Sequence, residues 1–244
     1  QAQAAKYGAV ITGSVIIQAA DGSHRNRLLW ARPEGEVLHY DKRHLFRMAG
    51  EHDHYTPGER QVQFELKGWR IRSLICYVLC FPVWSRDAQD TDLLLYTANC
   101  LVSRLLHWNR LLPARAIENL CYVAAVNRVG TDGKGFAYTG DSQVLDFQGE
   151  TLLSAGEADG VFQVNLDAAE LAAYRTKFPA NLDADSFQFF LSSSIAGSPA
   201  KRPSSSSKTH SKKGPWIHTQ GPSHLSRRFT LPSLPAGSTS GSGR

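Results

Sequence analysis

Short apolar runs alternate with an amphipathic segment in the middle of this chain. The run DLLLYTANC (residues 92–100) is apolar enough for a buried strand, and residues 106–120 show the period of an amphipathic helix. Residues 121–129 are again apolar and rich in valine and alanine. A strand, a helix and a strand in succession are typical of α/β proteins. We therefore predict an α/β fold.

Turn signals divide the preceding residues into further strands. We expect a buried strand at residues 10–17 and strands at residues 27–31 and 37–40, joined by Asp-Gly and Pro/Gly turns as a meander. Residues 61–79 contain two more strands around Lys67-Gly68. The second of these is almost wholly apolar, which indicates a central strand. Together with the strand–helix–strand unit, these strands predict a mixed sheet.

The C-terminal part of the body contains turn and helix signals. We expect strands around the turns Gln148-Gly149 and Asp159-Gly160. We also expect a helix that begins at Asp167, a good capping residue, and ends at Pro179.

The composition changes abruptly after Phe190. Residues 191–244 are dominated by Ser, Pro, Gly and Lys, and such a segment cannot bury enough apolar surface to offset its ordering entropy. This segment holds eight of the 27 Lys and Arg residues and no Asp or Glu, so residues 1–190 carry a net charge of −3. We therefore predict a folded domain at residues 1–190, a disordered basic tail at residues 191–244, and no nucleic-acid partner.

The cysteines and the apolar runs bear on the compartment. Cys76, Cys80, Cys100 and Cys121 lie in apolar segments, and four cysteines in 244 residues are too few for a disulfide scaffold. No apolar run reaches the roughly 20 residues of a membrane span. The N-terminal QAQAAKYGAV lacks the basic region and apolar core of a signal peptide. We expect a cytoplasmic protein without a membrane partner.

Three short motifs could indicate other chemistry. EHDH (residues 51–54) has four potential metal ligands in a row, but adjacent side chains rarely converge on one ion, so a polar surface loop is the simpler interpretation. A zinc site built from the four cysteines would need an unusual C-x3-C spacing. GTDGKG (residues 130–135) lacks P-loop spacing and indicates a glycine-rich turn between strands. We expect neither a metal nor a cofactor.

Seven segments between about residues 5 and 188 share the order and spacing of one known family. They are YDKRHLF (40–46), EHDHYTPGE (51–59), LICYVLCFP (74–82), LLLYTAN (93–99), HWNRLLPARAIEN (107–119), VNRVGTDGKGFAYTGDSQVLDFQGE (126–150) and YRTKFPANLDADSF (174–187). In these motifs the chain resembles the nitrilase superfamily of carbon–nitrogen hydrolases, and within it the bacterial omega-amidases.

The resemblance implies a four-layer α-β-β-α sandwich within residues 1–190. It also implies hydrolysis of the terminal amide of small 2-oxo acid amides, such as 2-oxoglutaramate, through a cysteine thioester with release of ammonia. The implied partners are the small amide and water, and the family suggests a homodimer.

The same resemblance assigns roles to individual residues. Cys76 matches the nucleophile, whereas Cys80 stands where the family usually has arginine. A strand-to-turn junction would expose the Cys76 sulfur, and a thiolate is a competent nucleophile. Lys42 matches the lysine that stabilises the oxyanion, and the backbone N–H of Tyr77 would be a second oxyanion donor. Glu51 matches the supporting glutamate.

The sequence also departs from the family pattern. The general-base glutamate of the family lies on a strand upstream of the meander, so we expect an N-terminally truncated domain without its first strand and helix. Val78 and Cys80 replace the acidic and basic residues of the usual C-Y-D-x-R-F-P run. Residues 99–108 lack the tryptophan and proline that the family has after the asparagine corresponding to Asn99. Two hypotheses stay open: an amidase, or a catalytically inactive remnant that lacks the general base.

Overall fold

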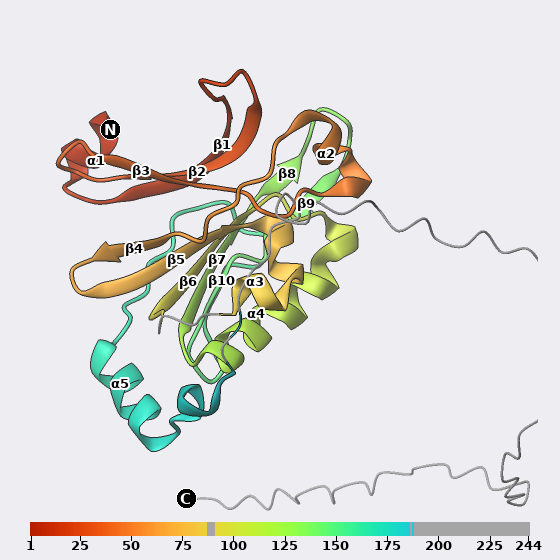
Figure 1. Ribbon diagram of the computed structural model, residues 1–244. Helices are drawn as coiled ribbons and strands as arrows, with labels where there is room; N and C mark the ends of the chain where they lie inside the picture. Colours follow the sequence, from red (N-terminus) through yellow and green to blue (C-terminus); the bar gives the residue numbers. More distant parts are fainter. Residues whose placement is uncertain (87–90, 186, 188–244) are drawn as a thin grey trace, which may run out of the picture. The chain divides into compact units, whose positions relative to one another are not determined.

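Two β-sheets and the helices packed against one of them dominate the structure, a computed structural model (Figure 1). It describes residues 1–86, 91–185 and 187. The expected tail, residues 191–244, lies outside the described residues. Within the described ranges, none of the helices combines the length and hydrophobicity that a membrane span requires.

The N-terminal sheet is the expected antiparallel meander. It follows the short helix α1 (Ala2–Tyr7) and consists of β1 (Ile11–Gln18), β2 (His24–Ala31) and β3 (Val37–Asp41). The expectation of a buried first strand is wrong, because every residue of β1 is half-buried or exposed. In the described residues β1 lies at the edge of this sheet, so it has a strand neighbour on one side.

The larger sheet has six strands and is mixed, as expected. Its order is β11-β10-β7-β6-β5-β4, with β5, β6 and β7 parallel and the other pairs antiparallel. The strands are β4 (Gln63–Leu66), β5 (Trp69–Ile75), β6 (Leu93–Ala98), β7 (Tyr122–Asn127), β10 (Gln143–Leu145) and β11 (Thr151–Ser154). Lys67 (φ 50°) and Gly68 (φ 83°) form the predicted turn between β4 and β5. Positive φ at both positions matches the twist of a two-residue hairpin.

Short elements connect these strands. They are η1 (Arg47–Ala49), α2 (Glu51–His54), η2 (Cys76–Cys80), α3 (Pro82–Ser85), η3 (Val102–Arg104), β8 (Val129–Thr131), β9 (Ala137–Thr139) and η4 (Ala180–Asp183). The GTDGKG motif forms the end of β8 and the turn toward β9, which confirms a glycine-rich turn between strands. The predicted helix after β6 is α4 (Leu105–Asn119).

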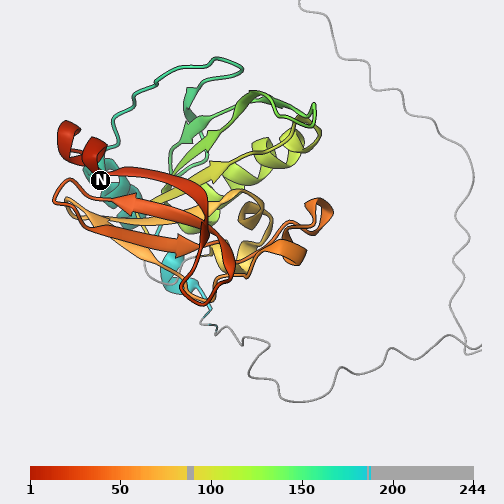
Figure 2. The same cartoon turned by 90° about the horizontal axis from the view of Figure 1, so that it is seen from above.

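The meander packs on one face of the larger sheet, and α3 and α4 lie on the other (Figures 1 and 2). Trp30 of β2 stacks on Phe64 of β4 with ring centroids 4.7 Å apart. One core runs through this interface to α4, where Trp108 and Leu112 are buried. The described residues therefore form three layers, β-β-α, of the four-layer sandwich.

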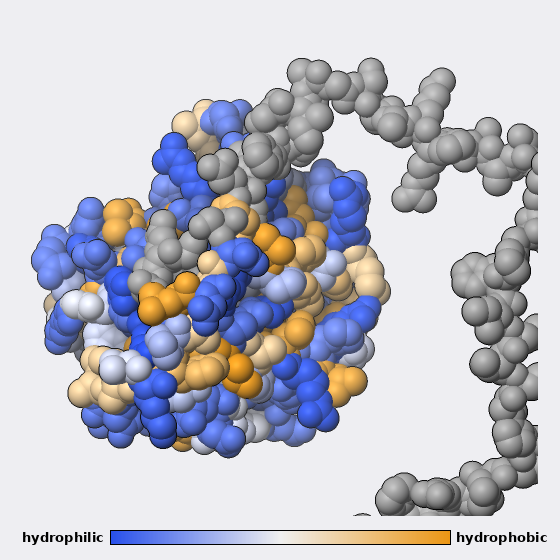
Figure 3. Space-filling view, turned by 60° about the horizontal axis from the view of Figure 1, so that its bottom comes forward, coloured by the Kyte–Doolittle hydropathy of each residue, from blue (hydrophilic) through white to orange (hydrophobic). Residues whose placement is uncertain are grey.

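Helix α4 is only weakly amphipathic. Its buried positions include Arg115 and Asn119, whereas Leu106 is 68% exposed and Ile117 is exposed as well. Hydrophobic side chains also appear among hydrophilic ones on the face of the molecule shown in Figure 3. Burial along this helix is therefore decided by what it packs against rather than by hydrophobicity alone.

The C-terminal part departs from expectation at one turn. The predicted strands around Gln148-Gly149 are β10 and β11, but the segment around Asp159-Gly160 forms no strand in the described residues. An alternating pattern is insufficient when no neighbouring strand offers hydrogen bonds. The predicted last helix is α5 (Ala168–Lys177), and the Asp167 carboxylate accepts from the backbone N–H groups of Ala169 and Glu170.

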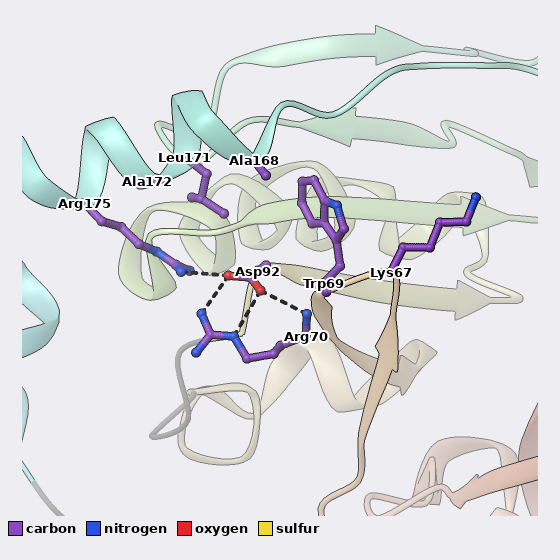
Figure 4. A pocket seen from close by; sticks show the side chains of 9 residues that line it. Lys67, Trp69, Arg70, Asp92, Ala168, Leu171, Ala172 and Arg175 are labelled. Carbon is purple, nitrogen blue, oxygen red and sulfur yellow. Dashed lines mark hydrogen bonds and ion pairs between the residues drawn. The ribbon is translucent and has the colours of Figure 1, made fainter.

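Asp92 connects α5 to the larger sheet (Figure 4). Its carboxylate accepts from the backbone N and the guanidinium of Arg70 on β5, at 2.9–3.0 Å. It also accepts from Arg175 on α5 at 2.8 Å. These residues line a pocket with Trp69 and Leu171. The pocket lies at the start of β5, at the end of the strand opposite to Cys76.

We expect Asp92→Asn to lower the free energy of unfolding by about 2 kcal/mol at pH 7, because charged hydrogen bonds to two arginines are weakened. Burial alone would raise the pKa of Asp92, but the hydrogen bonds from Arg70 and Arg175 lower it overall below the usual 3.8. The stabilisation is therefore complete above about pH 3.8 and is lost as the pH falls through the lower, folded-state pKa.

Urea unfolding of both proteins between pH 7 and pH 3 measures this difference. The exposed Asp159→Asn is the matched control and should change nothing. A difference between wild type and Asp92→Asn that stayed constant down to pH 3 would contradict this account of Asp92.

Candidate active site

The ends of three strands bring distant parts of the sequence together. Strands β5 and β6 are parallel, and Ile75 pairs with Thr97 near their C-terminal ends. Cys76 therefore leaves the sheet at the same edge as Asn99 and Cys100, which follow β6. Lys42 follows β3 of the smaller sheet. The structure thus supplies one site from segments more than 20 residues apart.

Cys76 lies at a sharp junction between β5 and η2. Its backbone has φ 44°, in the left-handed region that residues other than glycine rarely adopt. The following turn is held from two sides, because Ser85 Oγ donates to the Val78 carbonyl and the Arg115 guanidinium donates twice to the Leu79 carbonyl, at 2.7 and 3.2 Å. The strained backbone is therefore maintained by buried polar contacts.

Lys42 and Glu51 form a buried ion pair beside this junction. The Lys42 ammonium lies 2.9 and 2.7 Å from the two carboxylate oxygens of Glu51. The side chain of Lys42 is 2% exposed and that of Glu51 is 18% exposed. Glu51 also accepts from the backbone N–H of Phe46 at 2.7 Å. This carboxylate therefore fixes the position of the lysine.

The EHDH segment corrects the expectation of a surface loop. It forms the single helical turn α2, which follows Gly50 with φ 71°. Glu51 points inward to Lys42, whereas the other three side chains of the motif are exposed. The contact with Lys42 explains why Glu51 is less exposed than the other three residues of the motif.

The groups around the Cys76 sulfur shift the pKa of its thiol in opposite directions. Burial raises the pKa of the thiol above its usual value. The positive charge of Lys42 and hydrogen bonds from the backbone N–H groups of Asn99 and Tyr77 lower this pKa, and Glu51 raises it. The net effect is a raised pKa, so Lys42 and the two N–H groups only partly offset burial.

Cys100 interacts electrostatically with both Cys76 and Cys80. Burial, together with Cys76 and Cys80, raises the pKa of Cys100 to about 12. Cys80 is an exposed residue. Partial burial of its thiol nevertheless raises the thiol pKa. Cys121 is buried in the core, in the cluster that includes Leu112 and Val123. Of Cys76, Cys80 and Cys100, Cys76 is the thiol whose pKa Lys42 lowers.

Aromatic residues surround the chain near Tyr77. Its ring packs against Phe46 and Phe81, at 4.9 and 5.0 Å between centroids. His44 stacks on Phe81 at 3.7 Å, and burial lowers the pKa of His44 to about 4. At neutral pH this imidazole is uncharged, so it adds no positive charge near Lys42.

Sequence reasoning missed two residues of this region. Asn99 contributes its backbone N–H, and Asn127 contacts the backbone of Cys100. Both lie in segments that carry the family resemblance. A backbone group leaves no mark in a side-chain pattern, so the sequence offered no signal for the first of them.

Comparison with known proteins identifies the class to which this fold and site belong. The family model of carbon-nitrogen hydrolases matches residues 1–176. "Omega-amidase YafV" of Escherichia coli (strain K12) is 52% identical over 190 residues, which are 78% of this chain and 74% of the relative. The chain therefore belongs to the carbon-nitrogen hydrolase family, and the expected membership of the nitrilase superfamily is confirmed.

Two more relatives bear on the fold and the branch of the family. The crystal structure of XC1258 from Xanthomonas campestris, a CN-hydrolase superfamily protein with an arsenic adduct in the active site, superposes with a TM-score of 0.76 at 48% identity. The match covers 78% of this chain and 74% of that one. "2-oxoglutaramate amidase" of Bacillus subtilis (strain 168) is 34% identical over 180 residues, 72% of this chain and 69% of the relative. The predicted α/β nitrilase-type fold is confirmed.

Proposed function

We propose that this chain is an amidase of the omega-amidase type, which hydrolyses the terminal amide of small 2-oxo acid amides such as 2-oxoglutaramate. The relatives named omega-amidase and 2-oxoglutaramate amidase support the substrate class. The observation that carries the proposal is the buried Lys42, held by Glu51 and acting electrostatically on Cys76.

In this proposal the Cys76 thiolate attacks the amide carbon. The oxyanion of the tetrahedral intermediate is stabilised by the Lys42 ammonium and the Tyr77 N–H. Collapse of the intermediate breaks the C–N bond, and the nitrogen leaves as ammonia after taking up a proton. Water then hydrolyses the thioester, which yields the 2-oxo dicarboxylic acid and regenerates the thiol.

Glu51 acts on this reaction through Lys42. Both of its oxygens accept from the ammonium, and one also accepts from Phe46 N–H. Because these contacts hold the ammonium of Lys42 in place, we propose a positioning role for Glu51.

The alternative hypothesis of a catalytically inactive chain has a specific observation in its favour. The pKa of Cys76 is raised, and the carboxylate that acts on it in the described residues, Glu51, is already engaged by Lys42. A protonated thiol is a poor nucleophile, and general-base assistance contributes about 10²–10⁴-fold to such a step.

One experiment separates these functions. Ammonia release from 2-oxoglutaramate is measured with the purified full chain and with Cys76→Ala, and the protein is analysed for an acyl adduct by mass spectrometry. We expect release of many equivalents per chain, abolished in Cys76→Ala. Release limited to one equivalent with a stable adduct on Cys76 would support the inactive alternative. No release and no adduct would contradict the amidase proposal.

Glutamine serves as the matched substrate control, because it carries the same terminal amide and an amine in place of the 2-oxo group. A much faster reaction with 2-oxoglutaramate is expected. Equal rates with both amides would contradict the preference for 2-oxo acids.

Two further expectations stay predictions. We predict a homodimer, which light scattering of the purified chain at several concentrations tests. We also predict a cytoplasmic location, which cell fractionation tests. A monomer at all concentrations would contradict the first.

A further inference from the structure

The side-chain amide of Asn127 makes two hydrogen bonds to the backbone of Cys100. Its Oδ1 accepts from the Cys100 N–H at 2.7 Å, and its Nδ2 donates to the Cys100 carbonyl at 3.1 Å. The same Nδ2 donates to the Gly140 carbonyl at 2.6 Å. Asn127 is only 6% exposed, so these are buried amide contacts.

This arrangement continues the sheet beyond its last backbone pair. The parallel register between β6 and β7 ends with Ala98 opposite Asn127. Past this point the side-chain amide supplies one acceptor and one donor, as the backbone of a neighbouring strand would. The Cys100 backbone is therefore held in line with β6, although β6 itself has ended.

Asn127 is itself fixed on the opposite side. Its backbone N–H donates to Ser142 Oγ at 2.9 Å, and the Ser142 hydroxyl lies 3.2 Å from the Asn127 carbonyl. The backbone N–H of Arg128 donates to the Ala98 carbonyl at 3.2 Å. The amide that holds Cys100 thus projects from a rigid strand end.

The residue before Cys100 contacts the candidate nucleophile. The parallel register that sets Ile75 opposite Thr97 brings Asn99 to the same edge as Cys76, and the backbone N–H of Asn99 lowers the pKa of the Cys76 thiol. The Asn99 side chain is exposed.

The Asn99 N–H belongs to the peptide between Ala98 and Asn99, whose carbonyl accepts from the Arg128 N–H. The next peptide, between Asn99 and Cys100, is held by Asn127. The conformation of Asn99 is therefore restrained by a fixed peptide on each side. We propose that Asn127 is a positioning residue, which holds the Cys100 backbone so that the Asn99 N–H points at the Cys76 sulfur.

The inference rests on the proposed function in taking Cys76 as the nucleophile. A hydrogen bond to the sulfur stabilises the thiolate relative to the thiol and lowers the thiol pKa. Other groups that act on this sulfur are Lys42, Glu51 and the Tyr77 N–H, and electrostatic coupling with Cys76 reaches Cys100 and Tyr138. Of these groups, Asn127 contacts Cys100, through its backbone and not through its thiol.

The test measures the pH dependence of Cys76 alkylation by iodoacetamide in the full chain, with the modified peptide quantified by mass spectrometry. In Asn127→Ala we expect the midpoint to rise by about one pH unit, which slows alkylation about tenfold at pH 7.5. Cys100→Ala is the matched control, because it removes the neighbouring thiol and keeps both backbone groups. Its midpoint should stay within a few tenths of a unit of the wild type.

Ser142→Ala separates positioning from general stability. It loosens the strand end behind Asn127 but leaves the amide contacts to Cys100. We expect a lower melting temperature and an unchanged Cys76 midpoint. If Asn127→Ala does not fold, Asn127→Ser replaces it, because a serine hydroxyl is too short to bridge both groups of Cys100.

A folded Asn127 variant with the wild-type midpoint would overturn the inference, as would an equal midpoint shift in Ser142→Ala. The readout is independent of turnover. A shifted midpoint without ammonia release would contradict the proposed amidase and leave the role of Asn127 intact, whereas ammonia release with an unshifted midpoint would do the reverse.

Discussion

Lys42→Met should lower kcat/KM for 2-oxoglutaramate by about 10²–10³-fold, the effect of losing one oxyanion donor in a dry site. Lys42 is almost fully buried and contacts both oxygens of Glu51. Its charge is also the leading influence that lowers the pKa of Cys76. The substitution therefore removes the oxyanion partner and leaves the negative charge of Glu51 to raise the thiol pKa further.

Steady-state ammonia release and the pH midpoint of Cys76 alkylation check this prediction together. Lys134→Met, at an exposed lysine, is the matched control and should keep wild-type values. The double variant Lys42→Met/Glu51→Gln should be more stable than Lys42→Met, because it leaves no unpaired carboxylate. Its activity should stay as low as that of Lys42→Met. Activity of Lys42→Met within threefold of wild type would contradict the assigned role.

Gly58→Ala should lower the free energy of unfolding by about 1–3 kcal/mol and reduce activity with it. The Gly58 N–H donates to the Lys42 carbonyl at 2.9 Å, and Arg43 donates to the Gly58 carbonyl at 3.1 Å. A Cβ at this position would overlap with the backbone carbonyl of Asp41. The backbones of Gly58 and Asp41 must therefore move apart. This displaces the end of β3 and Lys42, which follows it.

Gly133→Ala is the matched control for this change. Neither glycine has a positive φ, and an added Cβ at Gly133 meets nothing within 4 Å. We expect Gly133→Ala to change stability by less than about 0.5 kcal/mol. Urea unfolding and ammonia release measure both variants, and a neutral Gly58→Ala would show that the two chain segments are not in close contact.

Local sequence signals located most of the secondary structure. The Lys67-Gly68 hairpin, the cap at Asp167 and the apolar run of β5 each depend on a few adjacent residues, and each was predicted correctly. Two predictions were wrong: that β1 is buried, and that strands flank Asp159-Gly160. Both depend on whether a neighbouring strand is available. Periodicity contains no information about that neighbour.

The candidate site divides in the same way. Lys42, Glu51, Cys76 and Tyr77 were selected by their motifs, and the structure brings Lys42 and Glu51 into contact beside Cys76. Their catalytic roles stay predictions. The motifs did not indicate that Glu51 would begin a helical turn and face inward.

The sequence by itself determined the family, the α/β class and the residue types available for chemistry, because motifs and strand patterns are properties of neighbouring residues. Tertiary structure alone decided which backbone groups surround the Cys76 sulfur. The parallel register of β5, β6 and β7 sets Ile75 opposite Thr97 and Ala98 opposite Asn127. A shift of that register by one residue would turn the Asn127 amide to the other face of the sheet and away from Cys100, so the surroundings of the sulfur exist only in the folded sheet.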